Sequence, residues 1–378
     1  MRTVPTDEQQ QLQSALRGLF ARSCPPALVR AMKEPSSDGV PTELWRALVA
    51  NGVFGLAIDP EFGGQGAGLY ELGLAFLEAG RVLCPTVVYS TLQFGVALNR
   101  WGSSTQRTTY LPALAAGELR ATLAVANPSD AGDVRPRLTA ERVTDGYRVT
   151  GRLLYVPDAA AADVVLVTAA TAEYGSPARC LGFLVDPTAV TIRPLASFAG
   201  DKQAELVFDG VLCPDSATMS GPHGAGLDPG DLRWASNAGL ALQCMEMLGG
   251  ATAILDRTVE YTKLRRQFGR PIASFQAAQH LVADMWIALQ NARLSAQSAM
   301  WWVGRGDTAT RSVAIAKLHC SEAYKKMSWT AHQLHGGMGF VRETDLHLWS
   351  ERAKVTEVRG GTADVAARWL QVELGLIS

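Results

Sequence analysis

Apolar residues recur at helical spacing through the first third of the chain. Leucines over residues 12–19 and Phe20 fall on one stripe, and Thr6 stands where a helix N-cap is expected. Further helical patterns cover residues 43–51 and 69–81, on either side of a loop rich in glycine and proline at 60–66. We therefore predict an N-terminal helical domain over residues 1–118.

From about residue 119 the pattern changes to short runs rich in β-branched residues. Turn pairs such as Asp145-Gly146 and Asp209-Gly210 stand between these runs. The runs cover residues 147–150, 164–167, 181–185, 190–192 and 205–208. This spacing predicts an antiparallel β domain over residues 119–218, followed by a loop rich in glycine, proline and serine.

Helical pattern returns near residue 231 and continues to the end. Long helices are expected over residues 231–264, 276–303 and 308–334, with a shorter helix after them. Long helices joined by short loops are typical of a bundle, so the third predicted domain spans residues 231–378. The predicted fold class is α+β, in the order helical domain, β domain, helical bundle.

Composition excludes several classes of protein. The 378 residues are 47% hydrophobic with a formal net charge of -1, so a broad surface for nucleic acid is not expected. The six cysteines form no CxxC pair, and no metal site is predicted. The polar N-terminus and the absence of an uninterrupted apolar run of about 18 residues argue against a signal peptide and a membrane span. Scattered free thiols favour the reducing cytoplasm.

Three strings carry candidate chemistry. RRQFGRPI at residues 265–272 ends a long helix in a basic turn, QLHGGMGF at 333–340 places three glycines within four residues, and an N-terminal set combines PEFGG at 60–64 with EAGR at 78–81. Each also has an ordinary interpretation: a helix end, a tight turn between helices, and a surface loop. His335 by itself is more typical of a core histidine than of a ligand.

In this order and spacing the three strings resemble the acyl-CoA dehydrogenase family of flavoproteins over nearly the whole chain. The resemblance implies an α domain, a β-barrel domain and a C-terminal four-helix bundle that mediates oligomer formation. It also implies an FAD shared across a subunit interface, an acyl-CoA substrate, and an electron-transfer flavoprotein as partner. QLHGGMGF with DLHLW at 345–349 is similar to the actinobacterial branch, several of whose members oxidise steroid side-chain CoA thioesters.

The resemblance implies cofactor contacts from eight residues. A guanidinium such as that of Arg265 suits a diphosphate because its planar fork matches phosphate oxygens. Clustered glycines let a backbone approach a ligand closely. The eight are Arg265, Phe268, Ile272, Gln276, Gln333, Gly336, Gly337 and Thr362.

The catalytic base of the family has no counterpart in this sequence. The reaction removes a proton from the carbon alpha to the thioester, which requires a carboxylate within hydrogen-bond reach. The usual glutamate position is occupied by Gly360, and the alternative position on the preceding long helix falls near Gly239. Glu246, about 10 Å further along that helix, is the remaining candidate, and it also fits a solvated or ion-paired helix residue. Glu357 fits a helix-surface charge.

The segments that face the flavin ring in the family are altered as well. The stretch VANPSDAGD at 125–133 has Ala126 and Gly132 where the family carries hydroxyl groups. The stretch YVPD at 155–158 includes Pro157, which has no N–H to donate. The groups that hold the nucleotide end are present, whereas those that face the reacting ring are not.

These differences predict the non-catalytic subunit of a heteromeric, α2β2 acyl-CoA dehydrogenase, with a homologous subunit as its partner. Three alternatives stay open at this point. One is a homomeric dehydrogenase with a relocated base such as Glu246. The others are a flavin monooxygenase or N-oxygenase on the same fold, and a binding protein without flavin.

Overall fold

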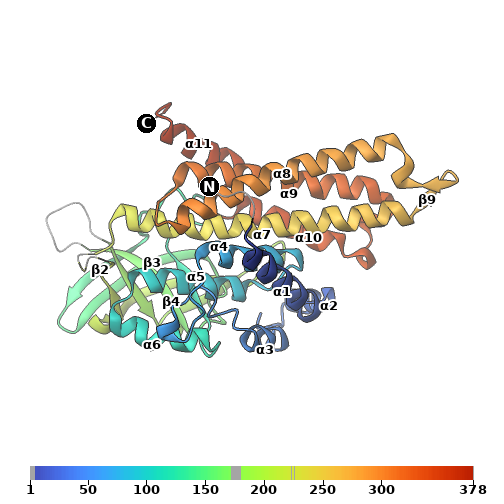
Figure 1. The fold of residues 1–378 in the computed structure, drawn as a ribbon. Helices are drawn as coiled ribbons and strands as arrows, with labels where there is room; N and C mark the ends of the chain where they lie inside the picture. The colour runs from blue at the N-terminus through green and yellow to red at the C-terminus, as the bar shows by residue number, and fades with distance from the viewer. Residues whose placement is uncertain (1–4, 172–179, 223, 225, 378) are drawn as a thin grey trace. The chain divides into compact units, whose positions relative to one another are not determined.

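The computed structural model describes residues 5–171, 180–222, 224 and 226–377. The chain forms two compact units (Figure 1). The first unit holds the residues up to Pro26, Gly73–Cys84 and the residues from Leu240 on. The second holds Ala27–Leu72 and Pro85–Gly239. The mixed helix and sheet composition confirms the predicted α+β class.

The first unit is helical. Its elements are α1 (Asp7–Ser23), the end of α4 (Leu69–Arg81), most of α7 (Pro229–Leu264), a hairpin of β9 (Arg266–Gln267) and β10 (Arg270–Pro271), α8 (Gln276–Gly304), α9 (Thr310–His335), α10 (Leu346–Val358) and α11 (Ala363–Glu373). Short 3-10 turns η4 (Ile272–Ser274), η5 (Gly336–Phe340) and η6 (Arg342–Thr344) connect them. The short connection between α8 and α9 makes them antiparallel neighbours, and α10 and α11 pack on α9 (Figure 1).

Local sequence accounts for the helices of this unit. The side chains of Thr6 and Gln9 form a reciprocal capping box at the start of α1, as the N-cap prediction requires. By length and composition α7 could cross a membrane, with a mean hydropathy of 1.4 over 18 residues. However, 89% of that window is buried inside the structure, which is typical of a core helix.

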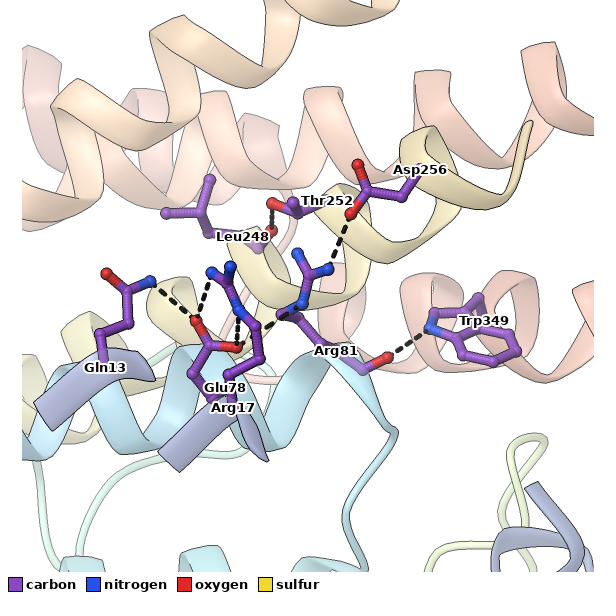
Figure 2. A network of polar contacts seen from close by, with 8 residues as sticks. All are labelled: Gln13, Arg17, Glu78, Arg81, Leu248, Thr252, Asp256 and Trp349. Atoms are coloured by element: carbon purple, nitrogen blue, oxygen red, sulfur yellow. Dashed lines mark hydrogen bonds and ion pairs between the residues drawn. The ribbon is translucent and has the colours of Figure 1, made fainter. Parts of the chain in front are cut away.

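A buried carboxylate joins three helices of the first unit (Figure 2). The Glu78 side chain on α4 accepts hydrogen bonds from Arg17 Nε and Nη2 on α1, both at 3.0 Å, and from Gln13 Nε2 at 2.7 Å. Arg81 lies 3.6 Å from Glu78 and donates to Asp256 of α7 at 2.7 Å. The EAGR string thus connects α1 and α7, rather than forming only a surface loop.

The second unit combines a sheet with helices. Its helices are α2 (Pro26–Lys33), α3 (Thr42–Ala50), α5 (Thr86–Trp101) and α6 (Ser104–Ala115), with 3-10 turns η1 (Pro60–Phe62), η2 (Pro187–Ala189) and η3 (Asp215–Ala217). Its strands are β1 (Ala121–Ala124), β2 (Leu138–Val143), β3 (Gly146–Pro157), β4 (Val164–Thr171), β5 (Cys180–Val185), β6 (Thr191–Leu195), β7 (Gln203–Pro214) and β8 (Thr218–Met219).

Among the described residues the sheet order is β6-β7-β3-β2-β4-β5-β8, with β1 beside β4. Most pairings are antiparallel as predicted, but β4 pairs in parallel with both β1 and β2. A parallel strand is usually covered on both faces, which explains why seven of the eight residues of β4 are buried. The antiparallel expectation is therefore corrected at these two pairings. Helix α5 packs against β1, where the Thr91 hydroxyl donates to the Ala121 carbonyl.

Candidate functional site

The basic turn at the end of α7 projects exposed groups from the first unit. The Ile272 N–H donates to the Arg265 carbonyl at 2.9 Å, which closes the turn around the β9–β10 hairpin. Phe268 adopts a φ of 52° and is 92% exposed, and Arg265 is exposed as well. A bulky residue rarely adopts a positive φ or such exposure without a partner surface. The hairpin is therefore a candidate contact site.

The glycine-rich turn after α9 leaves its backbone open. A Cβ atom added at Gly336 or Gly337 would meet nothing within 4 Å. At Gly339, by contrast, an added Cβ would lie 3.1 Å from His332. The first two glycines thus present an accessible backbone to a ligand, whereas the third is required for packing.

A histidine and a tyrosine hold these two turns together. The rings of Tyr261 on α7 and His335 at the end of α9 stack with centroids 4.2 Å apart, and the Tyr261 hydroxyl donates to the His335 carbonyl at 3.3 Å. His335 Nδ1 bonds to the Ala331 carbonyl at 2.8 Å, and burial lowers the pKa of its imidazole. His335 is therefore a core histidine, as its ordinary interpretation predicted. This contact joins the end of α7, four residues before Arg265, to the end of α9, where Gln333, Gly336 and Gly337 lie.

The eighth predicted contact, Thr362, lies elsewhere in the first unit. The turn before Thr362 is bonded to Lys317, which precedes Gln333 by sixteen positions on α9. At about 1.5 Å per residue these positions are roughly 24 Å apart along the helix. Figure 1 places α11, which follows Thr362, at the other end of α9 from the β9–β10 hairpin. The predicted contacts therefore form two separate half-sites.

The family's usual base position has a backbone suited to glycine. Gly360 has a φ of 76° and Gly361 a φ of 115°, and both are buried. A Cβ on Gly361 would lie 2.8 Å from Val365. A glutamate at either position would therefore be strained, by about 1 kcal/mol or more.

The carboxylates near that position are held in ion pairs. The side chain of Glu246 is 6% exposed and lies 3.7 Å from the Arg352 guanidinium, which itself is 8% exposed. Glu357, predicted as a surface charge, is instead buried and contacts Lys325 at 3.5 Å and Lys354 at 2.9 Å. These pairings favour a structural role for both glutamates.

The alternative base position lies in the second unit. Gly239 is a helical residue of α7, and a Cβ added to it would meet the Gln93 amide oxygen at 3.6 Å, an ordinary contact. A Cβ atom thus fits at Gly239, and the helical backbone there needs no positive φ. No carboxylate occupies this position.

The side chains of Asn127, Asp130 and Asp133 make hydrogen bonds or ion pairs within residues 127–137. Asn127 Oδ1 accepts from the Ser129 N–H at 3.0 Å, and Asp130 Oδ1 accepts from the Gly132 N–H at 2.9 Å. The Asp133 carboxylate binds Arg135 and Arg137, both at 2.7 Å. The hydrogen bond from Arg135 is the main cause that lowers the pKa of Asp133 to about 2. These groups are engaged within the loop.

The segment of residues 155–158 is also fixed by internal contacts. Asp158 is 2% exposed, has a φ of 53°, and accepts hydrogen bonds from Thr86 Oγ1 at 2.7 Å and Ser90 Oγ at 2.6 Å. Its own N–H donates to the Lys202 carbonyl at 2.9 Å. Tyr155 is half exposed, also at a positive φ. No pattern along the chain indicates this buried carboxylate, because its hydroxyl partners lie 72 and 68 positions away.

FAD, the cofactor that the resemblance implies, fits one part of this chain better than the other. The exposed Arg265 and the open backbone at Gly336 and Gly337 can accommodate a diphosphate. The residues at the positions that face the ring use their polar groups internally, as described above. The first set of residues therefore could hold the nucleotide end of the cofactor, whereas the polar groups named in the second set are already engaged within the chain.

Comparison with known proteins agrees with this architecture. Residues 6–118 match the family model of the acyl-CoA dehydrogenase N-terminal domain, and residues 234–374 match that of the C-terminal domain. An acyl-CoA dehydrogenase of Bacillus subtilis is 28% identical over 95% of this chain and 96% of its own length. An acryloyl-CoA reductase (NADH) of Anaerotignum propionicum is 28% identical over 86% of this chain and 84% of its own.

Solved structures give the same result. The ChsE4–ChsE5 complex from Mycobacterium tuberculosis has a TM-score of 0.88 and 26% identity, with full coverage of both chains. A variant of the Tcur3481–Tcur3483 steroid ACAD has a TM-score of 0.86 and 27% identity over 98% of this chain and 99% of that one. From the two domain matches, the fold and the arrangement of the three sequence strings, the chain belongs to the acyl-CoA dehydrogenase family.

Proposed function

We propose that this chain is the base-lacking subunit of a heteromeric, FAD-dependent acyl-CoA dehydrogenase. The enzyme would oxidise the α,β bond of an acyl-CoA thioester. FAD, when bound, supplies the hydride acceptor. This chain would contribute Arg265, Gln333 and the open glycine turn to the nucleotide end of a flavin whose ring lies in the partner subunit.

The carboxylates of the chain carry the proposal. Both family base positions are glycines, and the two nearest glutamates are buried in ion pairs with Arg352, Lys325 and Lys354. Each of these carboxylates is already engaged with a cation of the same chain. The relocated-base alternative, which depends on Glu246, is therefore disfavoured.

The two half-sites support a shared cofactor. The hairpin side and the Thr362 side are separated by roughly 24 Å along α9, so a single diphosphate cannot contact both within one chain. A flavin that uses both kinds of contact would need two subunits. The exposed Phe268 and Phe340, 92% and 78% accessible, would then be covered by the partner.

Similarity to the ChsE4–ChsE5 complex and to a steroid ACAD favours a homologous partner subunit in an α2β2 assembly and a steroid side-chain CoA as the substrate. An electron-transfer flavoprotein would reoxidise the flavin, in the cytoplasm. These assignments extend the proposal beyond the acyl-CoA dehydrogenase family itself, and the experiments below test its central part first.

Co-expression with a homologue that carries an acid at the base position tests the proposal. We expect one FAD per two chains in the purified complex, measured from the absorbance near 450 nm against protein concentration. The isolated chain should hold little flavin and show no acyl-CoA oxidation. Full flavin occupancy and turnover by the isolated chain would contradict the proposal.

Restoring an acid at Gly239 separates a missing base from a missing ring site. A Cβ atom at Gly239 makes only an ordinary contact at 3.6 Å with Gln93, so Gly239→Glu is the variant to test, with Gly239→Gln as the matched uncharged control. If only the base were absent, Gly239→Glu in the isolated chain would gain turnover over Gly239→Gln. We expect both variants to stay inactive, because the ring-facing groups are also absent.

A further inference from the structure

Lys317 is a lysine with no solvent exposure. It lies on α9, and its Nζ donates to the Thr356 carbonyl at 2.5 Å and to the Arg359 carbonyl at 2.9 Å. These carbonyls belong to the last turn of α10, where backbone acceptors have no partner inside the helix. The lysine therefore satisfies the end of α10 from within the protein core.

A second donor reaches the same two oxygens from another helix. Gln243 on α7 donates through Nε2 to the Thr356 carbonyl at 3.0 Å and to the Arg359 carbonyl at 3.4 Å. The end of α10 is thus held from α7 and from α9 at once. We call Lys317 and Gln243 the α10 clamp.

The α10 clamp holds a turn of two glycines, which is closed on its own side by the hydrogen bond from the Gly361 N–H to the Val358 carbonyl at 3.0 Å. Gly360 and Gly361 both have positive φ, and Thr362, the N-cap of α11, makes no side-chain capping bond. The Thr362 hydroxyl and the first N–H groups of α11 therefore remain available to an acceptor outside the helix. Two glycines without an external restraint would let this group vary in position.

We propose that Lys317 is a positioning residue for flavin binding: together with Gln243 it sets the turn that presents Thr362 to the phosphate end of the cofactor. This inference rests on the proposed function, because it assumes that the chain takes part in holding FAD. It assigns a role to a buried cation that contacts neither substrate nor cofactor.

The surroundings of Lys317 give the proposal a measurable signature. The groups that act on it are Cys244 on α7, Cys320 on α9, and Glu357 and Arg359 at the end of α10. Burial, the largest cause, lowers the pKa of Lys317 from 10.5 to about 8. The folded protein therefore releases this proton near pH 8, whereas the unfolded chain keeps it to about pH 10.5. Its contribution to stability rises with pH across that window.

Flavin retention by the co-expressed complex is the first test. Lys317→Met keeps the length of the side chain and removes the donors, and Lys326→Met, at an exposed position of the same helix, is the control. We expect the FAD dissociation constant of the complex to rise about tenfold for Lys317→Met, because both bonds that hold the turn from α9 are lost, and to stay unchanged for Lys326→Met. Equal flavin affinity in Lys317→Met and wild type would overturn the proposal.

Unfolding of the chain alone, without any flavin, is the second test. The denaturation midpoint of the wild type should rise relative to Lys317→Met between about pH 8 and pH 10.5. A difference that does not change with pH would show that Lys317 is not the buried cation described here. If no complex holds flavin, the proposed function is wrong. The pH dependence of unfolding still shows whether Lys317 is a buried group with a lowered pKa. If Lys317→Met does not fold, Gln243→Leu replaces it in the flavin test, with the same expected direction.

Discussion

Removing Arg352 should expose the role of Glu246. Arg352→Met leaves the Glu246 carboxylate buried, with its nearest cation, at 3.7 Å, removed. A charge pair at that distance interacts by roughly 4.5 kcal/mol at an effective dielectric constant of about 20. Breaking a buried ion pair by removing one partner costs about 3–5 kcal/mol in measured proteins. The same substitution removes the hydrogen bond from Arg352 Nη2 to the Cys84 carbonyl at 3.2 Å.

We therefore expect Arg352→Met to lower the free energy of unfolding by about 4 kcal/mol. Guanidinium denaturation at pH 7, followed by tryptophan fluorescence, measures the change. The double variant with Glu246→Gln should recover part of the loss, because the buried carboxylate charge that Arg352 faces is then absent. In the co-expressed complex, Glu246→Gln alone should leave turnover nearly unchanged.

Two results would refute this reasoning. A loss below about 1 kcal/mol for Arg352→Met would mean that the pair is solvated and worth no more than a surface salt bridge. A fall of a hundredfold or more in turnover for Glu246→Gln, without loss of stability, would identify Glu246 as a base and restore the relocated-base alternative. An arginine elsewhere in an exposed pair, Arg46→Met, serves as the control and should change stability by less than about 0.5 kcal/mol.

Three further outcomes follow from buried or paired groups. Glu78→Gln should lower the free energy of unfolding by about 3 kcal/mol, because Arg17 and Arg81 lose a buried carboxylate. Glu43→Gln, in an exposed pair, is the control and should lower it by less than about 0.5 kcal/mol; guanidinium denaturation measures both. The stability that Asp133 contributes should be fully present above about pH 4 and lost as pH falls through about 2, so the denaturation midpoints of wild type and Asp133→Asn should converge on acidification. All six thiols are buried, and burial raises the pKa of Cys180 to about 12, so a thiol reagent at pH 8 should label the native protein at a small fraction of the rate seen after denaturation.

Periodicity in the sequence predicted most helices of the chain because their cores are built from local patterns. The long helices α7, α8 and α9 begin and end within a few residues of the expected bounds. The runs that became β3, β4, β5, β6 and β7 were also visible. The partners of β4 were not, since parallel pairing with β1 and β2 depends on contacts between distant segments.

The candidate site was predictable where it depends on motifs and unpredictable where it depends on burial. The strings at 265–272 and 333–340 located the hairpin and the glycine turn. Neither Lys317 nor Arg352 stands out in the sequence, because the pattern along one helix does not show which polar residue faces the core. Their acceptors and partners lie 35 or more positions away, and only the folded chain brings them together.

The discontinuous composition of the first unit has a consequence for how the protein is made. Glu78 joins α1 to α4, and the neighbouring Arg81 joins α4 to Asp256 of α7 (Figure 2). Asp256 lies 175 positions after Arg81, so α4 is synthesised well before this partner. On the ribosome the face of α4 that carries Arg81 must therefore emerge long before its partner on α7. Such late closure leaves that face open to chaperones or to wrong neighbours during synthesis. Early co-translational contact with a homologous subunit would shorten this vulnerable interval.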